Sequence, residues 1–258
     1  MNKLVSSLLL STMVLLPLTG VAEPARRIVS LDLCTDWMLA RYADPARVAA
    51  LSPLNRQYAA PWPDAGWPVH DGTLERILQL KPDLVVTGEY NALLLRGRLQ
   101  TLGVKVEILP LPKSLKDVTA YEKRLLELLD IPADRASQAV PAPSQAGPSK
   151  RLLLLGPNGI GTGQSTFEND ILERAGWTNY LRGEGYIRLD LERIVADPPD
   201  AILASTSASR ALASRFAEHP VLQRAVPREH WLTTDYWRWQ CPGPWTWDLV
   251  RQLHQWLN

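Results

Sequence analysis

Residues 74–86 read LERILQLKPDLVV, and residues 191–203, which start 117 positions later, read LERIVADPPDAIL. The two stretches are identical at six of thirteen positions, and most of the other positions agree in polarity. Each stretch predicts a short amphipathic helix, a Pro-Asp turn that ends it, and a continuous apolar strand of the kind that lies buried in a parallel sheet. The repeat therefore predicts two lobes of similar construction.

An apolar run also stands before each copy. Residues 27–31 read RIVSL and begin 48 positions before Glu75, and residues 151–155 read RLLLL and begin 41 positions before Glu192. A short repeat can arise by chance, because Pro-Asp often follows a helix, but the matching lead strands argue against chance. We expect each half to open with a buried strand.

Strand and helix patterns alternate along the rest of the chain, which is typical of a parallel sheet covered by helices on both faces. The expected strands are residues 26–31, 48–51, 84–87, 104–109, 151–155, 201–204 and 231–233. The expected helices, besides those of the repeat, are residues 37–42, 92–102, 116–129, 167–175, 210–216 and 245–257, and the expected loops are 55–67 and 156–163. We predict an α/β fold with an N-terminal lobe at 23–115, a connector helix and proline-rich linker at 116–150, and a C-terminal lobe at 151–258.

The N-terminus predicts export. Asn2 and Lys3 form a weakly basic start, residues 4–18 are largely apolar, and Gly20-Val21-Ala22 supplies the small residues that a signal peptidase reads. We predict a signal peptide at residues 1–22, cleaved after Ala22. The alternative is a retained membrane anchor, but the apolar run is shorter than the roughly 20 residues that a bilayer core requires.

Composition excludes one class of function. Without Lys3, the chain keeps 27 Lys plus Arg against 27 Asp plus Glu, so the expected mature protein is close to neutral. Nucleic-acid binding needs a basic surface and is not expected. The aromatic residues are ten Trp and seven Tyr against two Phe. Because Trp and Tyr combine an apolar face with a polar edge, this bias favours ligand surfaces and interfaces.

The two cysteines, Cys34 and Cys241, stand near opposite ends of the expected mature chain. In an exported protein such a pair can oxidise, and closing so long a loop contributes about 3–5 kcal/mol in the chain-entropy model. We expect a disulfide. The alternative is two separate buried thiols that behave as small apolar residues.

Several catalytic or metal-binding motifs are incomplete. The glycine-rich residues 156–162 follow a strand as a phosphate loop does, but Thr162 stands where the phosphate-binding lysine belongs. The four histidines have no paired ligand spacing, so we expect no bare metal site. Ser165 is not part of a Gly-x-Ser-x-Gly motif. We therefore expect no catalytic residues and no resident cofactor.

Taken in order, the expected signal peptide, the RIVSL strand, the LERI helix with KPDLVV, LGVKV at residues 102–106, and the second LERI with its Pro-Asp resemble the periplasmic iron-complex and vitamin B12 binding proteins of ABC importers. The resemblance covers essentially the whole expected mature chain. It implies two Rossmann-like lobes joined by a single helical connector, and a siderophore, haem or corrinoid bound in the cleft between them. The chain departs from this family in its connector, because Pro141, Pro143 and Pro148 would each break a helix.

The resemblance also implies a permease partner. In this family a surface glutamate on each lobe pairs with permease arginines, and in the cobalamin-binding member the two glutamates match Glu75 and Glu192 here. One acidic contact on each lobe would hold both lobes in a fixed orientation, and charge-assisted bonds to Arg favour specificity and fast encounter. The alternative is that a glutamate in the first turn only favours the helix dipole.

The cleft should be lined by loops that follow the carboxyl ends of the strands, where open α/β sheets bind ligands. By the resemblance, His70 and Tyr186 match cleft aromatics of the cobalamin-binding member, whereas Ile160 stands where an aromatic residue is usual. The candidate cleft residues are Asp32, Leu33, Tyr58, Trp62, His70 and Tyr90 in the first lobe, and Asn158, Ile160, Tyr186, Arg188, Trp237, Arg238 and Trp239 in the second.

The sequence thus predicts a monomeric periplasmic substrate-binding protein that carries an iron complex or a corrinoid to an inner-membrane ABC permease. Which chelate or corrinoid it binds stays open. The alternatives are an exported enzyme and a protein-interaction module that uses the Trp-rich loops.

Overall fold

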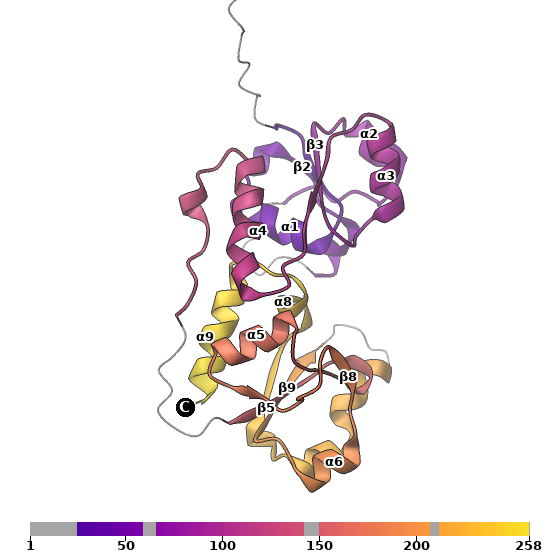
Figure 1. Cartoon of the computed structure of the whole chain (residues 1–258). Coiled ribbons are helices and arrows are strands. Elements are labelled where there is room, and N and C mark those ends of the chain that lie inside the picture. The colour runs from indigo at the N-terminus through magenta and orange to yellow at the C-terminus, as the bar shows by residue number, and fades with distance from the viewer. Residues whose placement is uncertain (1–24, 59–65, 142–149, 207–211, 258) are drawn as a thin grey trace, which may run out of the picture.

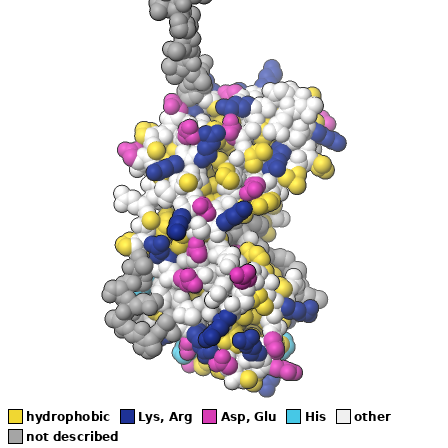
Figure 2. Space-filling view, in the orientation of Figure 1, with side chains coloured by type: hydrophobic (Ala, Val, Ile, Leu, Met, Phe, Trp, Pro, Cys, Tyr) yellow, Lys and Arg dark blue, Asp and Glu magenta, His cyan; other side chains and the backbone are white. Residues whose placement is uncertain are grey.

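The computed structural model describes residues 25–58, 66–141, 150–206 and 212–257. Figure 1 shows two α/β lobes, the N-terminal lobe above and the C-terminal lobe below. Figure 2 shows that the outline of the molecule narrows between them. The predicted signal peptide at residues 1–22 and Trp62 lie outside the described residues.

The N-terminal lobe contains a four-stranded parallel sheet in the order β2-β1-β3-β4. Adjacent residues of one strand face opposite sides: Ile28 packs with α1 and α4, and Val29 packs with α2 and α3. Both faces are therefore covered, as the continuous apolar runs predict. The strands are β1 (Ile28–Ser30), β2 (Val48–Ala50), β3 (Leu84–Gly88) and β4 (Val106–Leu109), and the helices are α1 (Leu33–Tyr42), α2 (Leu74–Gln79), α3 (Leu93–Thr101) and α4 (Leu115–Leu128), with short 3-10 turns at Pro45–Arg47, Pro53–Arg56 and Ala133–Arg135.

The C-terminal lobe contains a six-stranded sheet in the order β10-β9-β5-β6-β8, with β7 also paired to β5. Strands β10, β9, β5 and β7 are parallel, whereas β6 and β8 add an antiparallel edge. The strands are β5 (Arg151–Leu155), β6 (Ile160–Thr162), β7 (Thr178–Asn179), β8 (Tyr186–Arg188), β9 (Ala201–Thr206) and β10 (Trp231–Asp235). The helices are α5 (Phe167–Arg174), α6 (Leu191–Ala196), α7 (Pro220–Ala225), α8 (Tyr236–Gln240) and α9 (Trp245–Leu257), with 3-10 segments at Pro157–Gly159, Leu212–Glu218 and Arg228–His230.

The sequence predicted a single loop for the glycine-rich residues 156–163. The structure instead forms a 3-10 turn followed by β6. Its glycines allow close packing. A Cβ on Gly163 would lie 2.1 Å from the carbonyl oxygen of Gly183, and Gly159 has a φ of +68°. The glycines therefore serve the antiparallel edge of the sheet.

The repeat forms equivalent structures in the two lobes. The copies are α2 with β3 and α6 with β9, and each of these strands pairs in parallel with the opening strand of its lobe, β1 or β5. The Asp of each Pro-Asp turn faces the Arg at the start of that opening strand. The repeat predicted from the sequence is confirmed at the level of secondary structure and strand pairing.

These Arg and Asp residues form what we call the Arg–Asp clasp, which is Arg27 with Asp83 and Arg151 with Asp200. In the first lobe the Arg27 N–H donates to the Asp83 carboxylate (3.1 Å), and the Asp83 N–H donates to the Arg27 carbonyl oxygen (3.2 Å). In the second lobe the corresponding distances are 2.6 and 3.0 Å. The clasp fixes the start of the opening strand against the Pro-Asp turn that follows the repeat helix.

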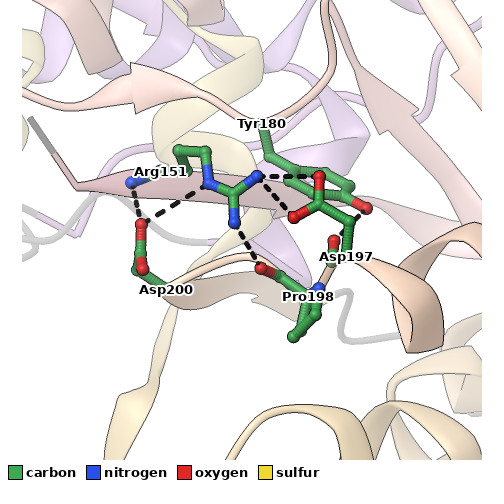
Figure 3. A network of polar contacts seen from close by, with 5 residues as sticks. All are labelled: Arg151, Tyr180, Asp197, Pro198 and Asp200. Atoms are coloured by element: carbon green, nitrogen blue, oxygen red, sulfur yellow. Dashed lines mark hydrogen bonds and ion pairs between the residues drawn. The ribbon is translucent and has the colours of Figure 1, made fainter.

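The guanidinium groups complete each clasp. Arg27 Nε donates to the carbonyl oxygen of Leu80 (2.8 Å). Figure 3 shows the second lobe, where Arg151 binds the Asp197 carboxylate at 2.9 Å and the Pro198 carbonyl oxygen at 2.7 Å. The ring of Tyr180 lies beside the guanidinium, whose central carbon is 5.7 Å from the ring centroid.

Two helices, α4 and α9, join the cores of the two lobes. Leu115 at the start of α4 packs in the C-terminal core, whereas Leu125 packs in the N-terminal core. Trp245 at the start of α9 packs in the N-terminal core, whereas Leu253 packs in the C-terminal core. The lobes are therefore held by two helices from different parts of the chain, which Figure 1 shows one above the other on one side of the molecule.

Helix α4 is the helix of the predicted connector, and α9 adds a second contact between the two cores. Helix α4 ends at Leu128, a 3-10 turn follows, and residues 136–141 have no regular structure. The buried Glu122 holds this segment against the N-terminal lobe, because its carboxylate accepts from the Ser137 N–H (2.7 Å) and hydroxyl (2.6 Å). The prolines at 143 and 148 lie outside the described residues.

The expected disulfide between Cys34 and Cys241 is confirmed, with 4.9 Å between the Cα atoms. Cys34 lies in the first turn of α1, and Cys241 directly follows α8, so the bond links the two lobes. Nearby, the rings of Trp37 and Trp245 meet edge to face with centroids 5.3 Å apart. The same junction is thus held by a covalent bond and by aromatic packing.

Candidate functional site

The carboxyl ends of the two sheets meet at the lobe junction. The disulfide connects the segment after β1 to the segment after β10. The Leu115 N–H, which follows β4, donates to the Asp170 carboxylate of α5 across the same junction (3.2 Å). Open α/β sheets bind ligands at this edge, so the space between the lobes is the candidate site.

Two predicted residues of the first lobe, Leu33 and Asp32, are buried and serve its structure. Leu33 is part of the N-terminal core. Asp32 is 3% exposed, and its carboxylate accepts from the N–H groups of Cys34 (3.0 Å), Thr35 (3.1 Å) and Gly88 (2.6 Å). It therefore caps α1 and holds the loop after β3.

His70 is also buried, at 2% exposure. Its Nε2 lies 2.8 Å from the Ser30 carbonyl oxygen, and its Nδ1 accepts from the Gly72 N–H at 2.9 Å. These contacts assign the neutral tautomer with the proton on Nε2, and burial lowers the pKa of the ring. His70 links the segment before α2 to the end of β1 rather than presenting its ring to solvent.

The loop after β3 presents Tyr90, whose side chain is 63% exposed. The Arg96 guanidinium fixes this loop by donating to the carbonyl oxygens of Gly88 (3.2 Å) and Glu89 (2.7 Å). Tyr58, by contrast, is half-buried against the N-terminal core, and its carbonyl oxygen accepts from the Trp37 indole at 3.0 Å. Among the predicted first-lobe residues that the structure describes, Tyr90 is the one that offers an open aromatic face.

In the second lobe, β6 and β8 bring several predicted residues together. Ile160 lies opposite Arg188 in the antiparallel ladder, and Thr162 lies opposite Tyr186. Arg188 is exposed, Ile160 is half-buried, and Asn158, with a φ of 62°, is exposed in the turn before β6. This edge combines aromatic, aliphatic and cationic side chains.

Tyr186 is 66% exposed, and its hydroxyl lies 3.2 Å from Glu168 Oε1. Glu168 stands in the first turn of α5 and is 5% exposed. Burial raises the pKa of its carboxyl above the usual range. The sequence analysis missed Glu168 because a glutamate just after a Thr cap reads as a residue that favours the helix dipole.

The segment after β10 differs from the expected loop. Residues Tyr236–Gln240 form α8. Trp239 is 2% exposed within the C-terminal core, and Arg238 donates to Gln252 Oε1 at 3.4 Å. The side chain of Trp237 is outside the described part of the structure. Trp239 therefore contributes to the core, because the helical turn directs it inward.

The two repeated glutamates are exposed. Glu75 follows the Thr73 cap of α2, and Glu192 follows the Asp190 cap of α6. Figure 1 shows α2 and α6 toward opposite ends of the molecule. Each lobe thus presents one repeated carboxylate at its surface.

The described residues contain no cluster of three or more His, Cys, Asp or Glu side chains arranged to hold a metal ion. None of the helices in the described ranges is long and apolar enough to cross a bilayer.

Two parallel-rich α/β lobes with a candidate site between their carboxyl edges define the class of two-lobed binding proteins. The sequence profile of the family described as periplasmic binding protein matches residues 27–228. The chain belongs to this family. A search of curated protein sequences finds no significant match.

Solved structures show the same fold over nearly the whole chain. A possible iron-binding (periplasmic solute-binding) protein from Staphylococcus epidermidis is 18% identical with a TM-score of 0.70, covering 91% of this chain and 99% of that chain. A periplasmic heme-binding protein from Pseudomonas aeruginosa is 21% identical with a TM-score of 0.68, covering 90% and 92%. The periplasmic vitamin B12 binding protein BtuF of Vibrio cholerae is 18% identical with a TM-score of 0.60, covering 91% and 97%.

Proposed function

We propose that this chain is the substrate-binding protein of an ABC importer, and that it carries an iron complex or a corrinoid to a permease of the inner membrane. In this proposal residues 1–22 are removed during export, and the mature protein is monomeric and performs no catalysis. The observation that supports it most is the pair of exposed tyrosines, Tyr90 and Tyr186, on the two lobes that border the candidate site.

The side chains around these tyrosines suit a large ligand with apolar faces and a polar rim. The tyrosine rings offer flat apolar surface, and Arg188 offers a cation for carboxylate or phosphate groups of a ligand. Haem and vitamin B12 are the ligands named for two of the similar structures. Because identity to those proteins is at most 21%, the choice of ligand must come from binding measurements.

A fluorescence titration tests the ligand. The purified protein, whose sequence contains ten Trp residues, is titrated with haemin, cobalamin and a panel of ferric siderophores. We expect one of them to quench Trp emission with a Kd below about 10 μM and little change in secondary structure, because the lobes are preformed. Replacement of Tyr90 or Tyr186 by Ala should lower the affinity for that ligand. If none of the ligands binds in this range, the proposed ligand class is wrong.

The permease partner is tested at the repeated glutamates. Glu75→Arg or Glu192→Arg should leave ligand affinity unchanged and reduce uptake, and the double variant should be worse. Loss of a rim ion pair costs only about 0–1 kcal/mol, but reversal also places like charges together at the contact.

A matched control for the reversal is Glu229→Arg. Glu229 is exposed on the 3-10 turn before β10 and belongs to neither repeat helix. This variant should support normal uptake. Normal uptake by the Glu75→Arg/Glu192→Arg protein would instead show that the repeated glutamates only stabilise their helices.

A further inference from the structure

A pocket of about 420 Å³ opens in the C-terminal lobe, at the amino-terminal ends of three parallel strands. It is lined by Lys150, Ala201 and His230, which stand directly before or at the start of β5, β9 and β10. The carboxyl ends of the same strands face the lobe junction. The pocket and the candidate site therefore lie at opposite edges of one sheet.

The floor of this pocket is apolar and rigid. Trp177 is 3% exposed, and its indole Nε1 donates to the Leu253 carbonyl oxygen of α9 at 2.9 Å. The half-buried ring of Trp256 lies beside it, with the two ring centroids 5.2 Å apart. Pro199 is also buried and lines the pocket. Because indole rings and proline lose little conformational freedom on binding, this floor is a preformed surface for a flat apolar group.

The rim of the pocket is polar and offers hydrogen-bond donors. Lys150 Nζ donates to the Leu257 carbonyl oxygen at 2.8 Å, which holds the ammonium at the rim and leaves further N–H donors of that group for a ligand. The exposed ring of His230 offers another donor. Asp200 also lines the pocket, but its carboxylate accepts from the Arg151 N–H at 2.6 Å and is therefore occupied within the clasp. The rim thus suits an anionic group.

The floor and the rim together suit an organic ligand better than water. Ordered water needs several polar groups around it, whereas this floor offers aromatic rings and aliphatic carbons. Poorly ordered water above such a floor is displaced favourably by an apolar group. The volume of the pocket lies within the range of about 300–1,000 Å³ that is typical of small-molecule sites, where a mostly apolar lining carries a few placed polar groups.

We propose that this pocket is a second binding site, for a small aromatic anion whose ring lies against Trp256 and whose anionic group binds Lys150 and His230. Aromatic rings stack on an indole, and an ammonium binds a carboxylate through charge-assisted hydrogen bonds. The site goes beyond the proposed function, because it lies away from the candidate cleft and requires neither an iron complex nor a permease. Figure 1 shows the C-terminal end of α9, which carries Trp256, away from the lobe junction. Occupancy ties this end of α9 to the starts of β5 and β10, so it stabilises the folded chain.

The probe for this site is naphthoate, an aromatic carboxylate. Its matched controls are naphthylmethanol, which lacks the charge, and cyclohexanecarboxylate, which lacks the aromatic ring. The isotopically labelled protein is titrated with each compound, and binding is followed by the assigned NMR signals of the Trp177 and Trp256 indole N–H groups. We expect naphthoate to shift both signals and to saturate with a Kd below about 1 mM. Each control compound should bind about tenfold more weakly.

Substitutions at the rim and the wall test the geometry of the site. Lys150→Met removes the ammonium and keeps an unbranched side chain, so it should lower the affinity for naphthoate about tenfold and leave that for naphthylmethanol unchanged. Lys123→Met makes the same change at an exposed lysine of α4 outside the pocket and should bind naphthoate like the wild type. Ala225→Phe places a ring in the pocket and should abolish binding of both compounds. Circular dichroism checks that each variant is folded, and Lys150→Met tests the proposal even if Ala225→Phe does not fold.

The cleft provides a separate control. Tyr90→Ala/Tyr186→Ala should bind naphthoate like the wild type, and the chelate or corrinoid that quenches Trp emission should not displace naphthoate. If this cleft variant loses naphthoate binding while Lys150→Met keeps it, the aromatic anion binds in the cleft and the proposed second site is wrong. Absence of saturable naphthoate binding, or equal affinity for naphthoate and naphthylmethanol, would also overturn the proposal. None of these outcomes changes the proposed transport function, which is tested by the titrations with haemin, cobalamin and ferric siderophores.

Discussion

Reduction of the disulfide should lower the stability of the whole protein without separating its lobes. Cys34 and Cys241 are 207 positions apart, so the bond closes most of the described chain into one loop. In the chain-entropy model a loop of this size stabilises the folded state by about 3–5 kcal/mol, through restriction of the unfolded chain. The folded junction should persist after reduction, because Trp37 and Trp245 stay packed and α4 and α9 still span both cores.

The assay is urea unfolding, followed by Trp fluorescence and by circular dichroism, of the oxidised and reduced wild-type protein. Because the oxidised and reduced proteins have the same sequence, their core packing should be nearly the same. A Cys34→Ala/Cys241→Ala variant tests whether the free thiols of the reduced protein affect its unfolding free energy. The reduced protein should also unfold with a larger m value, since its unfolded chain exposes more surface. A difference below about 1 kcal/mol between the two states would refute the reasoning, because the chain-entropy term would then be absent. Ligand affinity should be similar in both states.

Three further results are expected. Burial raises the pKa of Asp36 to about 7, so the folded protein binds this proton more tightly than the unfolded chain, and stability from this group is lost as pH rises from about 4 to about 7. In urea unfolding, Asp36→Asn should remove a pH-dependent loss of about 4 kcal/mol of unfolding free energy across that range. If the variant shows the same dependence of unfolding free energy on pH as the wild type, the raised pKa of Asp36 is wrong. Asp83→Ala and Asp200→Ala each break one Arg–Asp clasp and should each cost about 1 kcal/mol of unfolding free energy, whereas an effect confined to one lobe would show that the clasps are not equivalent. Glu168→Ala should lower the affinity for the ligand that quenches Trp emission about tenfold, because it removes the hydrogen bond between Glu168 and the Tyr186 hydroxyl. Glu168→Gln can still accept that hydrogen bond and should keep most of the affinity. Equal affinity of Glu168→Ala and wild type would show that Glu168 has no part in ligand binding.

The sequence predicted the repeated parts of the fold because their signals are physical requirements of the structure. The strands at 84–87 and 151–155 are apolar because both faces of their sheets are covered, and the observed bounds are Leu84–Gly88 and Arg151–Leu155. The Pro-Asp turn recurs because its Asp binds the backbone of the opening strand in each lobe. Local composition was sufficient here because burial on both faces and the Asp of the turn restrict which residue types each segment can carry.

The missed elements are short or depend on distant contacts. Strands β6, β7 and β8 have two or three residues each, and their glycines and polar residues give no apolar run. The aromatic segment before Cys241 was expected to be an exposed loop but forms α8, with Trp239 in the core. An indole suits a ligand surface and a core equally well, so the residue type did not distinguish them.

The candidate site residues were predicted from their positions in loops that follow strands. The structure agrees with this reasoning only in part. Residues just after a strand do lie at the carboxyl edge of the sheet, but Asp32 turns back to cap α1 and His70 binds the end of β1. Tyr90 and Tyr186 are exposed, and their contact with a ligand stays a prediction. Sequence fixes the order of residues along the edge, whereas side-chain direction depends on hydrogen bonds to segments far away in the chain.

The exchange of residues between the two cores has a consequence during synthesis. Trp245 packs in the same core as Leu125 and Leu129, so this core takes part of its packing from residues made 116 positions after Leu129. A chain that grows from its N-terminus exposes Trp37, the ring partner of Trp245, during all of that interval. The half that is made first is therefore completed together with the half that is made later, and a nascent chain stopped before residue 245 leaves apolar surface open to chaperones and proteases.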